Sequence, residues 1–329
     1  MIVPKHVIIA TGSSPKTLPS LPIDEKMILT SNGMLELTAL PKKVAIIGGG
    51  VIGVEWASLL NDFGVDVTIV EFLDQLVINE SQTIARELQK QLENRGIHIQ
   101  LGAKVEQATI KNKQVALTIA EQTDPLIVDK VMVAIGRQPN VEGIGLQNTS
   151  IKYSAKGITH NAFYQTTEDH IYAIGDVIDT LQLAHVAMKE GIIAVEHMAG
   201  LPVAPLNYND VPRCTYTDPE IASVGYTSSN YPQDRDVKIG RFNFNANAKA
   251  IILGDTAGFV EVLRDVVTDD IIGVSIIGAH ATDMIAEMSD AMYLDASATE
   301  IGDAVHPHPS LSEAIQEATL DTHKIAIHK

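Results

Sequence analysis

The chain has 329 residues, of which 45% are hydrophobic and 20% charged, a composition typical of a soluble globular protein with two or three domains. Its formal net charge of −17 argues against nucleic acid and anionic membrane as partners, because both would repel it. A single cysteine, Cys214, excludes an intramolecular disulfide and any multi-cysteine metal site and fits a reducing compartment, so we expect no metal. The longest apolar runs are strand-sized and the N-terminus does not resemble a signal peptide, so we expect a cytoplasmic protein with no membrane span.

The first apolar run is typical of an interior strand. Residues 6–10 (His-Val-Ile-Ile-Ala) predict a strand buried on both faces of a sheet, and Thr11, Gly12 and Ser13 end it. No earlier segment offers a strand to pair with it, so we expect an N-terminally truncated chain. Residues 14–41 contain several prolines and little periodicity, which indicates a connecting segment.

Residues 43–135 show the alternation of strands and helices that is typical of a dinucleotide-binding domain. The predicted elements are strand 43–47, helix 54–63, strand 67–70, helix 81–94, strand 97–100 and short strands within 104–135.

The turn after the first of these strands carries a G-x-G-x-x-G motif in Gly48-Gly49-Gly50-Val51-Ile52-Gly53. Gly48 permits the tight turn, and Gly50 lets backbone N–H groups approach a pyrophosphate. Gly53 allows close packing of helix on strand, and the helix N-terminus adds partial positive charge. The alternative is a glycine-rich turn that binds nothing.

The residue after the second strand favours NAD over NADP. Glu71 lies eighteen residues after Gly53, where its carboxylate can accept hydrogen bonds from ribose hydroxyls. The same charge would repel a 2′-phosphate, and residues 72–74 (Phe-Leu-Asp) supply no cation. Gly136 ends the strand predicted at 130–135, where a second glycine turn would border the same crevice.

The pattern changes at about residue 208. Before it, a strand-like segment ends at Asp176 and a helix is predicted over 183–199. After it, strands are followed by helices, which indicates a separate α+β domain. The predicted strands cover 213–217, 221–225, 238–244, 258–264 and 271–277, and the predicted helices cover 280–294 and 310–318.

Six segments resemble the pyridine nucleotide–disulfide oxidoreductases, and within them the dihydrolipoamide dehydrogenase branch. They are residues 9–13 (IATGS), 48–55 (GGGVIGVE), 134–137 (AIGR), 172–176 (YAIGD), 212–214 (PRC) and 306–313 (HPHPSLSE). The resemblance implies an α/β fold, with a Rossmann-like NAD-binding domain and the remnant of an FAD-binding domain, followed by an α+β interface domain. The implied division is 1–40 residual FAD-domain strand and linker, 41–150 NAD-binding domain, 151–208 FAD-domain return segment and 209–329 interface domain of a homodimer.

The resemblance also implies roles for single residues. Asp176 would bind the flavin ribityl hydroxyls, although a Gly-Asp pair after a strand is also a common turn. The residues implied beside FAD are Thr11, Gly12, Ser13, Asp176, Gln182, Leu183, Ala184 and His185. Those implied around NAD are Gly48, Gly49, Gly50, Val51, Ile52, Gly53, Glu55 near the nicotinamide, Glu71, Val105 near the adenine, and Gly136.

His308 and Glu313 are the expected acid–base pair. A histidine can accept a proton from a dihydrolipoamide thiol, and a carboxylate can orient its ring and stabilise the imidazolium. His306 is the local competitor. Glu313 has a structural alternative, because residues 310–313 (Ser-Leu-Ser-Glu) match a capping box with Ser310 as N-cap.

The implied reaction oxidises dihydrolipoamide, carried on an acyltransferase (E2) subunit of a 2-oxo acid dehydrogenase complex, with FAD and NAD as cofactors. It needs a redox cysteine pair and an N-terminal glycine fingerprint for FAD, and the sequence contains neither. Cys214 cannot replace the pair and is expected to be a small core residue. We therefore expect a chain that is inactive alone. The alternatives are a non-enzymatic NAD-binding dimerisation module and the C-terminal half of a split disulfide reductase.

Two related activities fit less well. A mercuric reductase would carry cysteines near the C-terminus, where this sequence has none. A glutathione reductase would favour NADP, with basic residues after the second strand.

Overall fold

The computed structural model describes residues 4–328, which fall into two compact units. Unit 1 comprises Met1–Lys16 and Gly136–Tyr208, and unit 2 comprises Thr17–Ile135 and Asn209–Lys329. Residues 1–3 and 329, the ends of the first and last predicted segments, lie outside the described part. The finer division into four segments stays a prediction.

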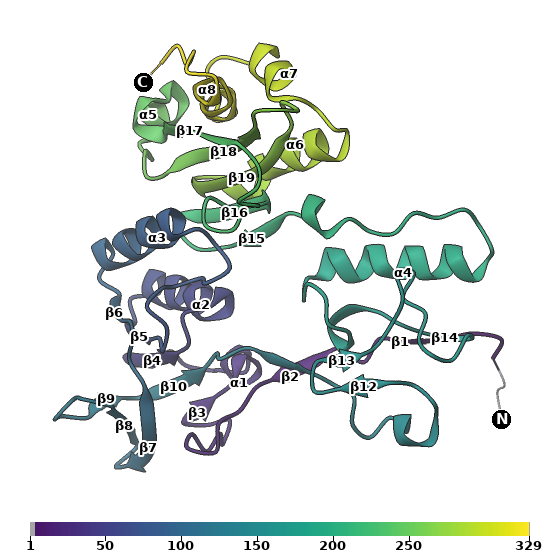
Figure 1. Cartoon of the computed structure of the whole chain (residues 1–329). Coiled ribbons are helices and arrows are strands. Elements are labelled where there is room, and N and C mark those ends of the chain that lie inside the picture. The colour runs from purple at the N-terminus through teal and green to yellow at the C-terminus, as the bar shows by residue number, and fades with distance from the viewer. Residues whose placement is uncertain (1–3, 329) are drawn as a thin grey trace. The chain divides into compact units, whose positions relative to one another are not determined.

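A five-stranded parallel sheet forms the centre of the first half of unit 2 (Figure 1). In sheet order its strands are β3 (Ile28–Leu29), β10 (Lys130–Val133), β4 (Lys43–Ile47), β5 (Asp66–Val70) and β6 (His98–Gln100). Its helices are α2 (Val51–Asp62) and α3 (Gln82–Asn94). Val44 and Ile46 of β4 pack beneath these helices, because alternate side chains of a strand point to opposite faces.

The opposite face of this sheet is also covered. Ala45 and Ile47 pack there against an antiparallel sheet of three strands. These strands are β7 (Val105–Lys111), β8 (Gln114–Ile119) and β9 (Leu126–Val128). Burial on both faces explains why β4 is apolar throughout after its first residue.

The predicted elements of this half lie within about two residues of the observed ones, with two exceptions. Helix α2 begins at Val51, not Val54, because residues of the glycine motif form its first turn. Residues 14–41 are not only a connection, since they contain β3 and α1 (Ser31–Leu35). Strand β3 has two residues, too few for a periodic pattern, and its pairing with β10 defines it.

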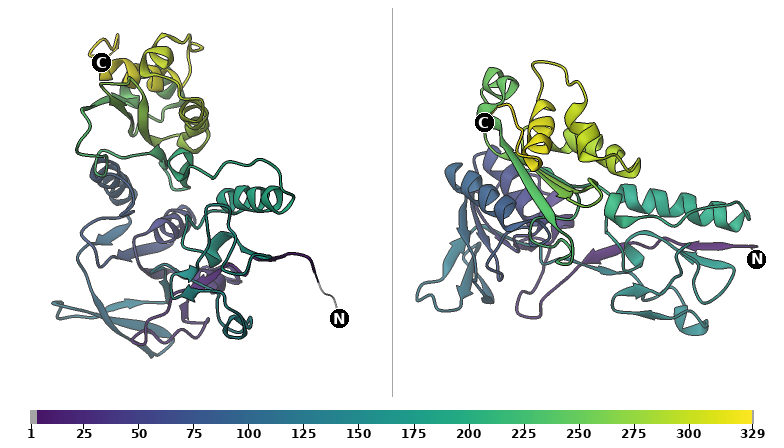
Figure 2. Two further views of the ribbon diagram at one scale, coloured as in Figure 1. Left: turned by 45° about the vertical axis from the view of Figure 1, so that its right-hand side comes forward. Right: turned by 45° about the horizontal axis from the view of Figure 1, so that its top comes forward.

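The second half of unit 2, the interface domain, is built on a five-stranded antiparallel sheet. In sheet order its strands are β15 (Arg213–Thr215), β16 (Glu220–Gly225), β19 (Ile271–Gly278), β18 (Phe259–Asp265) and β17 (Val237–Asn243). Its helices are α5 (Ala248–Leu253), α6 (Ala281–Tyr293), α7 (Ala298–Asp303) and α8 (Glu313–Thr322). Helices α6 and α8 cover one face (Figure 2). The fold class expected from the sequence, two dinucleotide-type parts followed by an α+β domain, is confirmed.

A row of polar residues crosses the other face of the interface sheet, one from each strand. In sheet order the row is Arg213, Ser223, Ser275, Glu261 and Arg241, each a cross-strand neighbour of the next. The three central members are at most 1% exposed. Glu80, which directly precedes the N-cap of α3, accepts a hydrogen bond from the Ser223 hydroxyl at 2.9 Å, so this face lies against the nucleotide-binding half.

Unit 1 has short sheets and one long helix, α4 (Ala184–Met198). Its paired strands are β1 (Val7–Ile9) with β14 (Ile171–Ala173), β2 (Ser13–Pro15) with β11 (Arg137–Pro139), and β12 (Tyr153–Ser154) with β13 (Gly157–Ile158). The prediction that β1 is buried on both faces is wrong for these residues, because Ile8 is 38% exposed. In the part of the chain that the structure describes, the strand pairs with one partner, β14, which comes from far along the chain.

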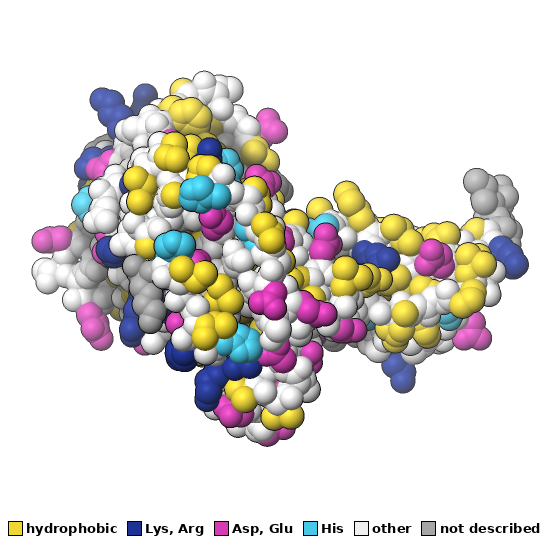
Figure 3. Space-filling model, turned by 90° about the horizontal axis from the view of Figure 1, so that it is seen from above, with side chains coloured by type: hydrophobic (Ala, Val, Ile, Leu, Met, Phe, Trp, Pro, Cys, Tyr) yellow, Lys and Arg dark blue, Asp and Glu magenta, His cyan; other side chains and the backbone are white. Residues whose placement is uncertain are grey.

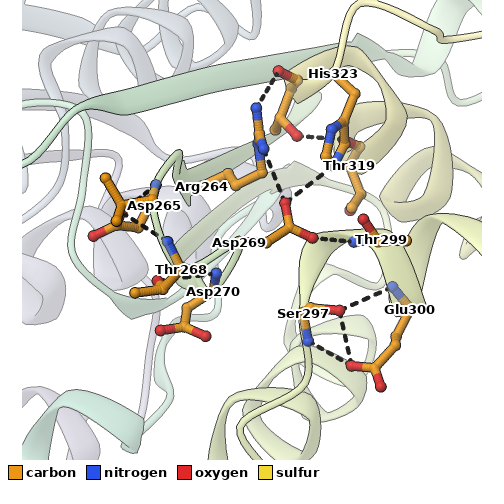
Figure 4. Close-up of polar contacts among 12 residues, drawn as sticks. Arg264, Asp265, Thr268, Asp269, Asp270, Ser297, Thr299, Glu300, Thr319 and His323 are labelled. Atoms are coloured by element: carbon orange, nitrogen blue, oxygen red, sulfur yellow. Dashed lines mark hydrogen bonds and ion pairs between the residues drawn. The ribbon is translucent and has the colours of Figure 1, made fainter.

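A polar cluster fastens the turn between β18 and β19 to the helices of the interface domain (Figure 4). The Asp269 carboxylate accepts hydrogen bonds from Arg264 Nη1 and from the Thr299 N–H, both at 2.9 Å. His323 Nε2 lies 3.4 Å from it. Burial opposes ionisation, but the hydrogen bonds from Thr299 and Arg264, and then the His323 ring, hold the pKa of Asp269 below its ordinary value of 3.8.

None of the helices within residues 4–328 is both long enough and apolar enough to cross a lipid bilayer.

Replacing Asp269 with Asn should lower the free energy of unfolding at pH 7 by about 1–3 kcal/mol, because Arg264 loses its charged partner. The folded-state pKa lies below the unfolded one, so this contribution is complete above about pH 4 and is lost as the pH falls through the lowered pKa. Urea unfolding at a series of pH values measures both effects. The exposed Asp234→Asn is the control, and equal acid sensitivity of wild type and Asp269→Asn would contradict the assignment.

Candidate functional site

The glycine turn joins the carboxyl end of β4 to α2 inside unit 2. Gly48 has φ of +109°, and a Cβ atom there would collide with the carbonyl oxygen of Ala134. A Cβ atom at Gly53 would collide with the Gly48 carbonyl oxygen, so α2 approaches the turn as closely as only glycine permits. A Cβ atom at Gly50 would meet nothing within 4 Å. The fold therefore requires Gly48 and Gly53, whereas Gly50 faces open space.

The N-terminus of α2 is available to an anion. Gly50 is the N-cap residue, and no side chain caps the helix. The first α-helical bond runs from the Val54 N–H to the Gly50 carbonyl at 3.0 Å. The N–H groups of Val51, Ile52 and Gly53 precede it and carry the partial positive charge of the helix end. This arrangement can hold a pyrophosphate.

Glu71 follows β5 and closes the turn. Its carboxylate accepts hydrogen bonds from the Gly49 N–H and, at 2.7 Å, from the Leu73 N–H. A carboxylate has about four acceptor positions, so two remain for ribose hydroxyls. The bond to Gly49 was not foreseen from the sequence, where Glu71 was assigned only to the ribose.

Three other residues predicted near NAD have structural contacts of their own. Glu55 on α2 accepts a hydrogen bond from the Tyr216 N–H at 2.8 Å, and burial raises its pKa. Val105 begins β7 and is buried in the core between the two sheets. Gly136 has φ of +107° and belongs to unit 1, where its carbonyl accepts a bond from the Lys16 N–H. Contact of these three with a nucleotide stays a prediction.

Unit 1 gathers several of the residues predicted beside FAD. The Ser13 hydroxyl donates to the Asp176 carboxylate and accepts a bond from Arg137 Nε at 2.7 Å. Arg137 Nη2 also donates to the Ser13 carbonyl at 2.7 Å. Arg137 was not among the predicted site residues, although it directly follows Gly136 in a family segment. The arginine fixes the serine and thereby orients Asp176.

The remaining residues predicted beside FAD lie in two places within unit 1, after the end of β1 and around the start of α4. Thr11 and Gly12 follow β1, and no atom lies within 4 Å of the Cβ position of Gly12, which has φ of +69°. The second group surrounds the start of α4, where Leu183 is the N-cap residue and makes no side-chain cap. Its exposed members are Gln182, Ala184 and His185.

Glu190 is a buried carboxylate that was also not among the predicted site residues. Its Oε2 accepts the Gly175 N–H at 2.6 Å, and its Oε1 accepts the hydroxyls of Thr180 and Tyr208 at 2.9 and 2.8 Å. It fastens α4 to the turn that carries Asp176. The sequence does indicate a role for Glu190, because it lies on the apolar face of the predicted helix, where an ionisable residue needs partners.

His308 and Glu313 are in direct contact. His308 Nδ1 lies 2.8 Å from Glu313 Oε1, and the Ser310 N–H donates to Glu313 Oε2 at 2.8 Å. Burial opposes ionisation, but the bonds from Ser310 and His308 lower the pKa of Glu313. An ionised carboxylate only accepts, so Nδ1 carries a proton and the Nε2 of a neutral ring is free to accept one. The His308 side chain is 72% exposed, so its Nε2 is accessible to a reacting group.

The local competitor, His306, is engaged elsewhere. Its side chain is 8% exposed, and its Nε2 lies 2.8 Å from Glu287 Oε1. His306 is thus buried beside Glu287, whereas His308 is exposed beside Glu313.

The capping box considered as the alternative for Glu313 forms only in part, because Ser310 does not cap the helix. Helix α8 begins at Glu313 with Ser312 as N-cap and runs to Thr322, so it does not span 310–318. Only the reverse contact of a capping box forms, from the Ser310 N–H to Glu313, while the Ser310 hydroxyl makes no cap.

Cys214 lies in β15 and packs against the core of the interface domain. Burial, and then the carboxylates of Glu220 and Glu80, raise its pKa to about 11. The thiol therefore stays protonated near neutral pH, as suits a core residue. Among the described residues, no group of three or more histidine, cysteine or acidic side chains could hold a metal ion.

Comparisons with known proteins match both parts of the chain. Residues 2–191 match the family model "Pyridine nucleotide-disulphide oxidoreductase", and residues 211–319 match the dimerisation domain of that family. A dihydrolipoyl dehydrogenase of Bacillus subtilis is 50% identical over 333 residues, covering 100% of this chain and 70% of that protein. The mitochondrial dihydrolipoyl dehydrogenase of Pisum sativum is 38% identical over 331 residues, covering 98% of this chain and 66% of its own length.

Solved structures agree with the sequence relatives. LpdA from Mycobacterium tuberculosis superposes with a TM-score of 0.90 at 29% identity, covering 96% of this chain and 69% of that one. The HOCl-induced flavoprotein disulfide reductase RclA from Escherichia coli gives 0.88 at 27% identity, covering 95% of this chain and 73% of that one. The 329 residues thus span about 70% of the length of these relatives.

Two glycine substitutions should separate binding from folding at the turn. Gly50→Ala should leave the unfolding midpoint unchanged and raise the dissociation constant for NADH at least about tenfold, because its methyl group enters the open side of the turn. Gly53→Ala should lower the free energy of unfolding by about 1–3 kcal/mol, because its methyl group meets the Gly48 carbonyl. Calorimetry and NADH fluorescence titration measure the two effects, and wild-type NADH affinity in Gly50→Ala would contradict the assignment.

Proposed function

The chain belongs to the pyridine nucleotide-disulphide oxidoreductases, and from this membership we propose that it supplies the NAD-binding, acid–base and dimerising parts of a dihydrolipoamide dehydrogenase. The family binds FAD and NAD. The observation that carries the proposal is the exposed His308–Glu313 pair, present in the same chain as a fully formed glycine turn. The reaction would be the oxidation of dihydrolipoamide to lipoamide, on the acyltransferase subunit of a 2-oxo acid dehydrogenase complex.

The residues of the turn fit NAD. The uncapped start of α2 would hold the pyrophosphate, and Glu71 has acceptor positions left for the ribose hydroxyls. The charge of Glu71 would disfavour the 2′-phosphate of NADP. When bound, NAD and FAD would supply hydride and electron transfer, and the part of this chain is to orient them.

The acid–base pair would handle the proton of the substrate. A dihydrolipoamide thiol would give its proton to His308 Nε2, leaving a thiolate and an imidazolium. The ionised Glu313, bonded to Nδ1, would stabilise that imidazolium and keep the ring oriented.

The residues of unit 1 fit the sugar side of FAD. Asp176, oriented by Ser13 and Arg137, would accept hydrogen bonds from the ribityl hydroxyls. The 329 residues contain a single cysteine, so this polypeptide by itself cannot cycle an intramolecular disulfide. We therefore propose that it does not turn over alone.

A homodimer through residues 209–329 is part of the proposal. The match to a dimerisation domain supports it. The space-filling view of the helical side of the interface domain shows hydrophobic and histidine side chains at the surface (Figure 3). Ile251, Ile252 and Leu253 of α5 are 58%, 66% and 49% exposed, which is typical of residues that a second copy would cover.

A split enzyme is the second candidate, favoured by one feature of unit 1. Within the described residues 4–328, strands β1 and β14 form a parallel sheet of two strands, and such sheets are normally wider and covered. Met188, Ile192 and Val195 form an apolar stripe on α4 and are 70%, 52% and 53% exposed. A separate polypeptide that adds strands and covers the stripe would complete the flavin domain. The third candidate, a non-enzymatic NAD-binding dimer, needs no such partner. A cytoplasmic location stays a prediction.

Reduction of lipoamide by NADH should be undetectable with the chain alone. It should appear when the part of the Bacillus subtilis relative that lies outside the matched region is co-expressed with it. Turnover by the chain alone would contradict the proposed inactivity. NADH binding without turnover in either preparation would favour the non-enzymatic module.

In the co-expressed preparation, His308→Gln should lower the lipoamide turnover number by about 10²–10⁴-fold, because the thiol loses its proton acceptor. His280→Gln, an exposed histidine on the same domain, is the matched control and should leave turnover unchanged. Steady-state kinetics measure both variants, and equal losses would remove His308 from the proposed role.

A further inference from the structure

The segment between β5 and α3 passes directly against the glycine turn. This segment, residues 72–80, is called the strap here. The Val77 N–H donates to the Gly49 carbonyl at 2.8 Å, while Glu71, just before the strap, accepts the Gly49 N–H. The Leu76 side chain occupies the place where a Cβ atom of Gly49 would stand. Both backbone polar groups of Gly49 are therefore bonded to residues of the stretch between β5 and α3.

The carbonyl of Gly49 and the N–H of Gly50 belong to one planar trans peptide group and point in opposite directions. When the carbonyl points at Val77, the Gly50 N–H must point away from the strap. An added Cβ atom at Gly50 would have no atom within 4 Å, so the turn has open space at this residue. The bond from Val77 thus fixes the direction of the N–H donor of a turn residue that has room for an anion beside it.

Val77 is held in a strained backbone conformation. Its φ is +41°, in the left-handed region that β-branched residues avoid, and its side chain is 3% exposed. Such strain persists only where the surroundings determine the conformation, and it is typical of ligand clamps.

The far end of the strap supplies those surroundings. The Glu80 N–H donates to the Val77 carbonyl at 2.8 Å, and the Glu80 carbonyl accepts from Gln75 Nε2 at 3.1 Å. The Glu80 carboxylate is buried and bonded to Ser223 of the interface sheet. The strap is therefore anchored at both ends.

We propose that Val77 is a positioning residue of the nucleotide site, whose backbone N–H holds the Gly49–Gly50 peptide group so that the Gly50 N–H faces the pyrophosphate of a dinucleotide. This inference rests on the proposed binding of NAD. The side chain of Val77 secures the strap in the core, and its N–H acts through Gly49.

Replacing Val77 with the corresponding α-hydroxy acid removes only the N–H and keeps the side chain. The dissociation constant for NADH should rise about tenfold, whereas that for adenosine, which lacks a pyrophosphate, should stay unchanged. The same ester at Val65 is the matched control, because Val65 is also a valine 3% exposed, and its N–H donates to the Leu60 carbonyl at 3.0 Å away from the turn. It should change neither constant.

Val77→Gly separates the N–H from the side chain. Glycine keeps the donor and suits a positive φ, so NADH affinity should stay within about threefold of wild type although the protein is less stable. Unchanged NADH affinity in the Val77 ester would overturn the inference. So would equal weakening in the Val65 ester, equal weakening of adenosine, or an equal loss in Val77→Gly.

A wild-type chain that does not bind NADH would overturn the nucleotide proposal without deciding the role of the strap. Hydrogen exchange of the Gly49 amide, which is bonded to Glu71, would then decide it. Faster exchange in the Val77 ester, but not in the Val65 ester, would support the clamp on the turn, and unchanged exchange would overturn it.

Discussion

The close approach of α2 to the end of β4 is the constraint on which the rest of unit 2 depends. Gly53 sits against the Gly48 carbonyl with no room for a side chain, and this contact sets where the helix starts and which way it runs. The open N–H groups at its start follow from that position. One turn further along, Glu55 and Ser58 accept the backbone N–H groups of Tyr216 and Asp218 in the interface domain. One helix therefore shapes the nucleotide turn and anchors the domain that carries the acid–base pair.

Burial separates the roles of chemically similar pairs in the interface domain. His306 lies 2.8 Å from Glu287 through Nε2, and His308 lies 2.8 Å from Glu313 through Nδ1. The first ring is almost fully covered and ties a loop to α6, whereas the second is open to a reacting partner. The separation alone would not distinguish the two pairs, but the ring nitrogen that is engaged and the solvent access of the ring do.

The parts of the fold that sequence patterns predicted are those governed by local physics. Strand β4 follows from a continuous apolar run, helix α3 follows from helical spacing, and the glycine turn follows from the positions of Gly48, Gly50 and Gly53. The parts that were missed depend on contacts between distant residues. Strand β3 exists because β10 lies beside it, and Arg137 matters because Ser13 and Asp176 meet there. The strained φ of Val77 could not be predicted, because nothing in the local sequence marks this valine as a residue with a positive φ.

The start of α8 shows a third reason why local sequence does not fully predict the structure. The string from Ser310 to Glu313 fits two local structures, and both use the same carboxylate. The competing partner, His308, lies only five residues away, yet the choice depends on how the preceding loop is folded. Local sequence narrows the candidates, and tertiary packing selects among them.

The polar row across the interface sheet has a consequence for how the strands find one another. Successive residues of a strand face opposite sides, so a slip of one position would turn Ser223, Ser275 or Glu261 into the apolar core beneath α6 and α8. Apolar residues at these places would allow several alignments of nearly equal energy. The polar row raises the free energy of sheets with a shifted strand register, and it thereby favours one strand pairing during folding.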